Sequence, residues 1–132
     1  MHPDQDLKHF LDKKNIYAVI GATPNKEKYG YKVFHTLKQA GYLAIPVNPN
    51  APDVDGIPAY KTLKDYPGTI DVVVFVVPPP IALDVLHQAA KQGIRKAWFQ
   101  PGSESAEALS FCKKQGIDAI HGMCIMVEST TA

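Results

Sequence analysis

The stretch that decides the fold is Val72-Val-Val-Phe-Val-Val77, which is followed at once by Pro78-Pro79-Pro80. A continuous β-branched and aromatic run of this kind is typical of a strand buried on both faces, so we expect it to be central in a sheet. Apolar runs at residues 16–20, 43–47 and 97–99 end just as abruptly, at polar, glycine or proline segments. In an open α/β sheet the ligand crevice lies beyond the carboxyl ends of the strands, so these endings mark a candidate binding rim.

Helical patterns alternate with the apolar runs. The spacing of apolar residues predicts three helices, each followed by a glycine suited to end it, over residues 30–40, 81–92 and 105–115. We also expect an N-terminal helix over residues 1–14, a last strand at 117–120 and a C-terminal tail at 121–132. The alternation predicts the α/β class with a doubly wound, five-stranded parallel sheet, and we expect the strand order 3-2-1-4-5.

Length and composition narrow the class of protein. A chain of 132 residues suits one domain, here residues 1–132. The 14 basic and 13 acidic side chains nearly balance, which argues against a nucleic acid or an anionic membrane as partner. No apolar run approaches the ~20 residues of a membrane span, and the first residues lack the pattern of a signal peptide. We therefore expect a soluble, cytoplasmic protein.

Metal and redox motifs are not visible in the sequence. The two cysteines, Cys112 and Cys124, stand too far apart for a Cys-x-x-Cys motif, and both lie in apolar surroundings that favour buried structural thiols. The five histidines show no ligand spacing such as His-Glu-x-x-His. We expect no metal site.

The first loop, Gly21-Ala-Thr-Pro-Asn-Lys-Glu-Lys-Tyr-Gly30, is the best candidate for chemistry. Backbone N–H groups at a helix N-terminus bind phosphate with the help of the helix dipole, and Thr23, Lys26 and Lys28 add side-chain donors. The loop matches neither Gly-x-Gly-x-x-Gly nor Gly-x-x-x-x-Gly-Lys-Ser/Thr, and Pro24 has no N–H to donate. An ordinary turn and a phosphate cradle both stay open.

The loop after the second strand disfavours NAD. An NAD site usually carries Asp or Glu about 20 residues beyond the glycines, whereas Val47-Asn-Pro-Asn50 offers only neutral side chains. A basic side chain would favour NADP, and none occurs between Val47 and Tyr60. Asn48 can hydrogen-bond a ribose or an adenine edge, or it can start the loop as an Asx turn.

The endings of the third and fourth strands complete the rim. The three prolines present a stiff apolar wall suited to an adenine face or an aliphatic arm, the alternative being a rigid connector between strand and helix. After the fourth strand, Gln100 and the backbone of Gly102 are candidates for ligand contact, whereas Ser103 and Ser105 fit helix caps.

Several segments together resemble the small stand-alone CoA-binding proteins, which are similar to the CoA-binding domain at the N-terminus of the succinyl-CoA synthetase α subunit. The resemblance covers residues 15–128 and depends on the order and spacing of residues 19–24, 41–49, Gly56, Tyr60, 77–79, 98–102 and 124–128. It implies a Rossmann-like domain that holds CoA along the carboxyl edge of the sheet.

The resemblance also implies site residues by position. It places a phosphate loop and helix opening at the first strand, a nucleotide-facing loop at the second, a Val-Pro-Pro wall at the third and a fourth rim segment. The residues in this order are Gly21, Ala22, Thr23, Pro24, Lys28, Tyr29, Gly30, Asn48, Pro49, Val77, Pro78, Pro79, Gln100 and Gly102. The first loop departs from the synthetase, because it lacks the Thr-Gly pair and the downstream Gln-Gly.

No catalytic set accompanies this rim. It holds no carboxylate pair and no Cys/His or Ser/His/Asp arrangement at motif spacing, and His121 does not match the phosphorylated histidine of the synthetase. We therefore predict a non-enzymatic module that binds coenzyme A or an acyl-CoA, as a sensor or as an accessory to a CoA-using enzyme. A homodimer is the default assembly. The alternatives are an NAD(P)- or nucleotide-binding subunit of an enzyme that a partner chain completes, and an interaction protein without a ligand.

Overall fold

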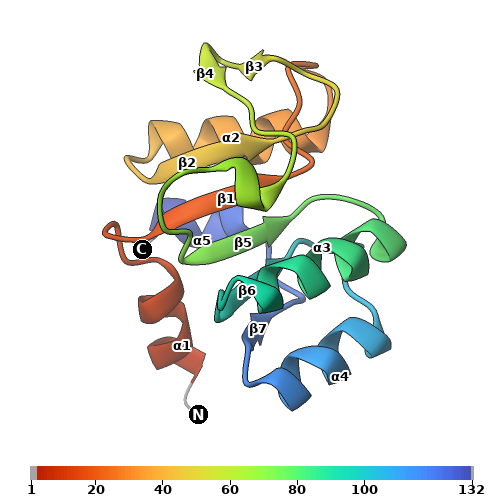
Figure 1. The fold of residues 1–132 in the computed structure, drawn as a ribbon. Helices are drawn as coiled ribbons and strands as arrows, with labels where there is room; N and C mark the ends of the chain where they lie inside the picture. The colour runs from red at the N-terminus through yellow and green to blue at the C-terminus, as the bar shows by residue number, and fades with distance from the viewer. Residues whose placement is uncertain (1–2, 132) are drawn as a thin grey trace.

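The computed structural model describes residues 3–131, which form a parallel sheet with helices on both faces (Figure 1). The five strands of the sheet, all parallel to their neighbours, are β1 (Ile16–Ile20), β2 (Leu43–Val47), β5 (Val72–Phe75), β6 (Lys96–Phe99) and β7 (Asp118–Ile120). The helices are α1 (Pro3–Phe10), α2 (Tyr29–Gln39), α3 (Pro79–Lys91), α4 (Ala106–Gln115) and α5 (Ile125–Thr131). A small antiparallel hairpin, β3 (Asp53–Val54) and β4 (Ile57–Pro58), and the 3-10 turn η1 (Leu63–Asp65) connect β2 to β5.

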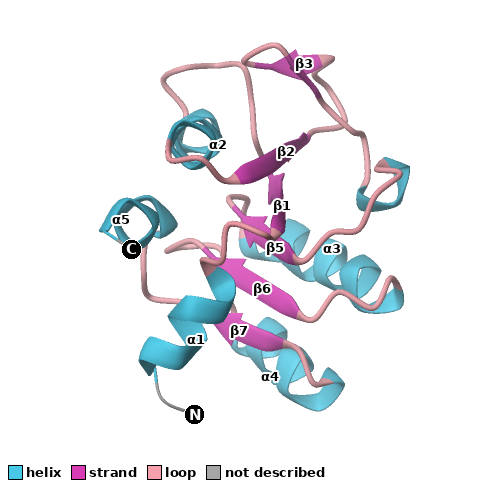
Figure 2. Cartoon of the chain, turned by 90° about the vertical axis from the view of Figure 1, so that its left-hand side faces the viewer, coloured by secondary structure: helices cyan, strands magenta, loops and turns pink. Residues whose placement is uncertain are grey.

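The sheet lies between two helical layers, with α1, α2 and α5 on one face and α3 and α4 on the other (Figure 2). Alternate residues of each strand enter opposite layers. Val72 and Val74 pack toward α1, α2 and α5, whereas Val73 and Phe75 pack toward α3 and α4. All four are fully buried, so the expectation of a central strand buried on both faces is confirmed. The Rossmann-like α/β class and the five-stranded parallel sheet are confirmed with it.

The strand order within that class differs from the prediction. Counted along the chain, the order is 2-1-3-4-5 (β2-β1-β5-β6-β7), so the predicted 3-2-1-4-5 is wrong. β5 pairs with β1 on one side and with β6 on the other, whereas an edge position would leave one row of its backbone N–H and C=O groups unpaired. The carbonyl of Pro46 accepts the Tyr60 N–H (3.0 Å) on the side away from β1, so the missing N–H of this proline also faces the outer edge, where proline is tolerated.

The predicted helices over 30–40, 81–92 and 105–115 are confirmed to within two residues at each end, as α2, α3 and α4. The N-terminal helix is shorter than predicted, because α1 ends at Phe10. Tyr17 Oη donates to the Phe10 carbonyl (2.6 Å) and Asn15 Nδ2 donates to the His9 carbonyl (2.8 Å), and these bonds cap the helix end.

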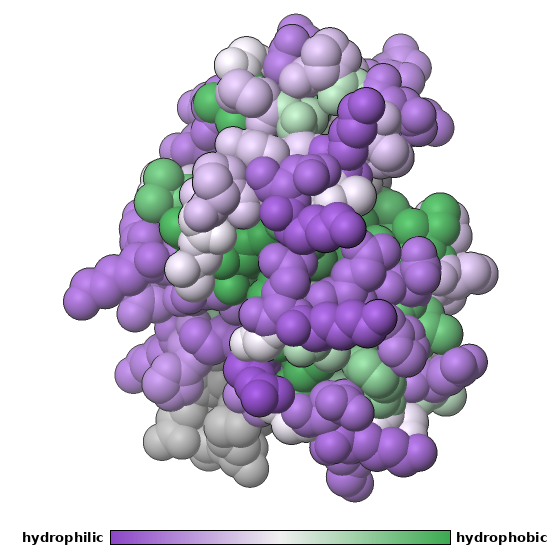
Figure 3. All heavy atoms as spheres, in the orientation of Figure 1, coloured by the Kyte–Doolittle hydropathy of each residue, from purple (hydrophilic) through white to green (hydrophobic). Residues whose placement is uncertain are grey.

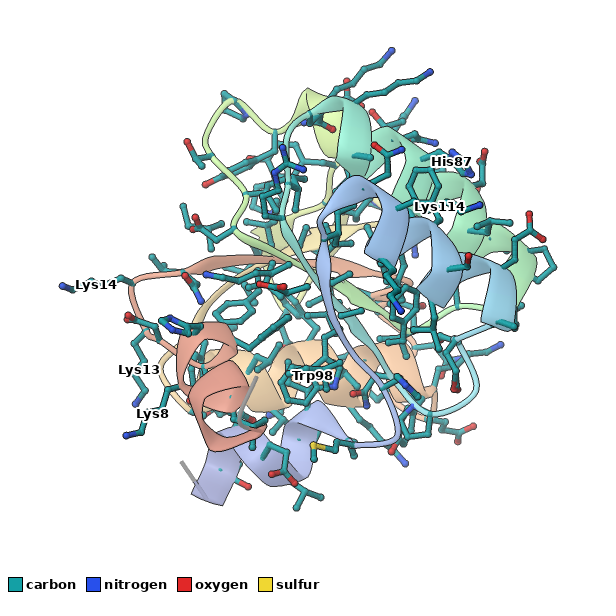
Figure 4. The ribbon with its side chains drawn as sticks, turned by 90° about the horizontal axis from the view of Figure 1, so that it is seen from below. Lys8, Lys13, Lys14, His87, Trp98 and Lys114 are labelled. Carbon is teal, nitrogen blue, oxygen red and sulfur yellow. The ribbon has the colours of Figure 1, made fainter. Side chains whose placement is uncertain are left out.

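The segment predicted as a tail contains α5, which packs against α2. Trp98, which Figure 4 labels, is fully buried with its ring 5.9 Å from that of Phe10, and its Nε1 donates to the Met123 carbonyl (3.0 Å). Ile125 is buried in the same layer. A helix of one to two turns carries too little periodicity to be recognised in a sequence. None of the helices between residues 3 and 131 is long and apolar enough to span a membrane.

Candidate functional site

The carboxyl ends of β1 and β5 form the switch point of the sheet. The helix after β1 joins the layer of α1 and α5, whereas the helix after β5 joins the opposite layer. In doubly wound sheets ligands bind in the crevice outside such a point. The loops that carry the predicted site residues follow β1, β2, β5 and β6, so the fold brings all four segments to this edge.

Two glycines allow α2 to begin directly over the end of β1. A Cβ on Gly21, whose φ is +99°, would overlap the carbonyl oxygen of Val76 and lie 2.8 Å from Val77 Cγ1. A Cβ on Gly30 would overlap the carbonyl oxygen of Gly21. Only glycine fits either position without a backbone shift, so the first turn of α2 is held against the switch point.

The N-terminus of α2 has the properties of an anion site. Its N-cap residue, Lys28, makes no side-chain cap, and the first turn contains no acidic residue. The first N–H groups of the helix are therefore open to an anion, which the helix dipole also favours. Lys28 and Tyr29 are exposed, Ala22 is buried, and the Thr23 hydroxyl accepts the Asn25 N–H (3.3 Å) within the loop.

Asn48 forms the Asx turn that sequence analysis left open. Its Oδ1 accepts the Asn50 N–H (2.7 Å), and its Nδ2 donates to the Ala22 carbonyl (2.8 Å). The side chain thus ties the loop after β2 to the loop after β1. Because both ends of the amide are engaged, Asn48 positions the two loops, and neighbouring groups are better placed to meet a ligand.

A cavity of about 300 Å³, which we call the β2 cavity, lies between the ends of β1 and β2, η1 and α3. Its walls are aliphatic and a few polar groups converge on it, as is typical of a small-molecule site. The residues that line it are Ile20, Gly21, Val47, Asn48, Pro49, Asn50, Lys61, Thr62, Leu63, Val77, Ile81, Val85 and Gln88. Figure 3 shows apolar surface at the right-hand side of this view, over the start of α3, where Ile81 is half exposed.

A second cavity of about 430 Å³, the β6 cavity, opens on the other side of Val77. Its lining consists of Tyr29, Val76, Val77, Pro78, Pro79, Gln100, Pro101, Gly102 and Ser103. Val77 lines both cavities, and Pro78 and Pro79 of the predicted wall line the β6 cavity, whereas Pro80 lines neither. Pro78 is also the N-cap of α3 and Pro79 its first residue, so the wall is a connector at the same time.

The polar residues after β6 hold the chain in place. Ser103 Oγ donates to the Val77 carbonyl (2.6 Å) and accepts the Val77 N–H (3.1 Å). These two bonds fix the backbone of Val77, which lies between the two cavities. Of the two serines predicted as caps, Ser105 caps α4 by accepting the Ala108 N–H (3.1 Å). The Gly102 N–H donates to Glu104 Oε1 (2.9 Å). The clamp of Ser103 on Val77 leaves no local signal in the sequence, because it joins two loops that follow different strands.

Gln100 is almost completely buried, with 1% of its surface exposed. Its Oε1 accepts the Ile125 N–H (2.7 Å) and its Nε2 donates to Cys124 Sγ (3.3 Å). The side chain lies at the rim, as expected, but its hydrogen bonds fasten the start of α5. We therefore assign it a positioning role.

The two cysteines differ. Burial raises the pKa of the Cys112 thiol to about 11, as expected for a structural thiol. Cys124 is only partly buried, and its Sγ lies 3.4 Å from Tyr29 Oη. Burial opposes its ionisation, but hydrogen bonds from Tyr29, Gln100 and two backbone N–H groups together hold the pKa of this thiol below its ordinary value. Among the side chains that the structure describes, those of residues 7–130, no group of three or more from His, Cys, Asp and Glu is placed to hold a metal ion.

Comparison with known proteins identifies the family. Residues 15–130 match the model of the CoA binding domain, and the chain belongs to this family. It is 31% identical over 137 aligned residues to the α subunit of acetate–CoA ligase (ADP-forming) II from Pyrococcus furiosus, and the match covers 96% of the chain and 30% of that subunit. The chain thus spans less than a third of the length of this curated relative.

Other relatives have nearly the same length as this chain. The uncharacterised protein YneT of Bacillus subtilis is 28% identical over 122 residues, which cover 92% of this chain and 90% of YneT. A solved structure of a conserved hypothetical protein from Pyrococcus furiosus is 41% identical with a TM-score of 0.83, and the match covers 86% of this chain and 98% of that one.

Proposed function

We propose that the protein binds coenzyme A or an acyl-CoA without catalysing a reaction itself, as a sensor or as an accessory to a CoA-using enzyme. The observation that carries the proposal is the pair of cavities that meet at Val77 beside the open N-terminus of α2. Coenzyme A has the matching shape, with an adenosine end, a central pyrophosphate and a long pantetheine arm.

The nucleotide end fits the β2 cavity. Its aliphatic walls suit the faces of an adenine ring, and the side chains of Asn50, Thr62 and Gln88 bring polar groups to its edge. The pyrophosphate would lie over Gly21 and Gly30, where the first N–H groups of α2 and the Lys28 side chain are available. The two glycines hold the first turn of α2 against the end of β1, as a glycine of dinucleotide-binding loops does in close helix–strand packing.

The pantetheine arm fits the β6 cavity, where Pro78, Pro79 and Pro101 offer apolar surface. Tyr29 also lines this cavity, and its hydroxyl lies 3.4 Å from Cys124 Sγ. The arm is flexible and aliphatic, so stiff proline walls that are already in place would bind it without ordering the protein further.

Membership of the CoA binding domain family supports the ligand, and relatives of nearly the same length support a role as a separate module. The ligase relative supports a link to CoA-using enzymes, because the chain matches about a third of that subunit.

The test is calorimetric titration of the purified protein with CoA, acetyl-CoA, dephospho-CoA, NAD and NADP at fixed salt, after mass spectrometry shows that no ligand has co-purified. Saturable binding of CoA and no binding of NAD would support the proposal. Binding of NAD or NADP in place of CoA would favour a subunit of a nucleotide-dependent enzyme. Binding of none of the five would favour an interaction protein.

A further inference from the structure

The loop directly after β2 carries no charged side chain, but the fold brings a lysine to it from further along the chain. The Tyr60 N–H donates to the Pro46 carbonyl (3.0 Å), the Asn48 N–H donates to the Tyr60 carbonyl (2.9 Å), and Val47 and Tyr60 form a parallel bridge. Lys61 follows directly and lines the β2 cavity. The stretch between Val47 and Tyr60 contains no basic residue, so only the folded chain places a lysine at this point.

The backbone around Lys61 is fixed from both sides. Tyr60 is held by the outer edge of β2, and Thr62 makes a capping box with Asp65, whose Oδ2 accepts the Thr62 N–H (3.1 Å) and hydroxyl (2.9 Å). Leu63 is buried against the core. The Lys61 side chain itself is exposed at the cavity, and among the described residues lining the cavity it alone is charged at neutral pH.

We propose that Lys61 binds the 3′-phosphate on the ribose of coenzyme A and thereby determines specificity for CoA over dephospho-CoA and NAD. This inference rests on the function proposed above. In dinucleotide-binding sheets a residue beyond the second strand contacts the ribose of the ligand. A carboxylate there binds a ribose hydroxyl group, and an arginine there binds a phosphate on the ribose. Here that position is neutral, and Lys61 supplies the charge from the neighbouring segment.

The chemistry of the Lys61 side chain supports a phosphate ligand. A lysine ammonium is a compact charge with three donors, suited to a phosphate that reaches it from the open side of a cavity. The carboxylate of Asp65, the nearest acidic residue in the sequence, accepts the Thr62 hydroxyl and N–H, which gives it partners of its own.

The experiment is titration of the full chain and three variants with CoA and with dephospho-CoA. Lys61→Ala should weaken CoA binding about tenfold, the size expected for one charge-assisted hydrogen bond at an exposed site, and change dephospho-CoA binding by less than about twofold. Lys61→Arg should restore most of the CoA affinity. Lys64→Ala, which removes the same charge from η1 but does not line the cavity, is the matched control and should bind both ligands like the wild type.

The outcomes separate this inference from the function on which it rests. If the wild type binds no CoA, the proposed function fails. If the wild type prefers CoA and Lys61→Ala keeps the same preference, only the role of Lys61 fails. An equal loss for both ligands would also overturn it, because the contact would then lie at the pyrophosphate or the cavity wall. Unchanged melting temperatures would show that Lys61→Ala folds normally.

Discussion

The two cavities on either side of Val77 use their polar residues differently. At the β2 cavity, Asn48 is engaged in positioning the loops, while Lys61 and Gln88 reach the cavity from the surface. At the β6 cavity, the polar side chains of Gln100 and Ser103 are buried and bound to backbone groups. Substitutions on the β2 side should therefore change ligand affinity, and substitutions on the β6 side should change stability.

The largest effect is expected at the two glycines that hold the start of α2 against the end of β1. Gly30→Ala should lower the free energy of unfolding by about 1–3 kcal/mol and abolish CoA binding, because its Cβ would overlap the Gly21 carbonyl oxygen and push α2 from the switch point. Urea unfolding and calorimetry measure the two effects. Gly93→Ala is the control, since its Cβ would meet no atom within 4 Å and only its positive φ would add strain. A Gly30→Ala variant with normal stability and affinity would show that the helix start is not tightly held.

At the N-terminus of α2, Lys28→Ala should weaken CoA binding by about 1.5–3 kcal/mol, or roughly tenfold to a hundredfold, with no change in melting temperature. The reason is loss of a charge beside the open N-terminus of α2. Lys32→Ala, one turn further along the same helix and also exposed, is the matched control. Unchanged affinity in the Lys28 variant would remove this side chain from the site.

On the β6 side, Gln100→Met should lower the free energy of unfolding by about 1–3 kcal/mol, because the Ile125 N–H loses its buried acceptor. CoA affinity, measured by calorimetry at a temperature where the variant is folded, should change less than in Lys28→Ala. Normal stability with a large loss of affinity would reverse the comparison and make Gln100 a ligand contact.

The smallest effect is expected far from both cavities, where His35 Nδ1 lies 2.6 Å from Asp55 Oδ2 and Tyr31 Oη donates to Asp55 Oδ1 (2.8 Å). The hydrogen bond from His35 is the main cause that holds the pKa of the Asp55 carboxyl below its ordinary value. A lowered folded-state pKa stabilises the protein above the unfolded pKa, and this stability is lost as the pH falls through the folded pKa.

Asp55→Asn should therefore reduce stability at pH 7 by at most about 1 kcal/mol, because the pair is partly exposed. The difference from the wild type should vanish at low pH, which urea unfolding between about pH 2.5 and 7 measures. Asparagine tolerates the positive φ of this residue, so the substitution tests the charge. A difference that persists at low pH would assign the loss to packing.

Much of the fold could be predicted because the relevant signals are local. The run at Val72–Phe75, the glycine stops and the apolar spacing of α2, α3 and α4 each lie within a few neighbouring residues. The order of the strands could not be read in this way, since it depends on the edge that accommodates Pro46 and on the neighbours of β5. Helix α5 was missed because a short helix gains its stability from tertiary contacts such as the bond between Ile125 and Gln100.

The sequence by itself determined which residues reach the carboxyl edge, including Gly21, Asn48, Val77 and Gln100, and it determined the strand ends to within two residues. It did so because burial patterns and turn residues act over short distances along the chain. Only the tertiary structure decided that Asn48 and Gln100 are engaged by backbone groups, that Ser103 clamps Val77, and that Lys61 lies beside the end of β2. These contacts join residues far apart in the sequence, and their partners are set by how the strands are placed next to one another.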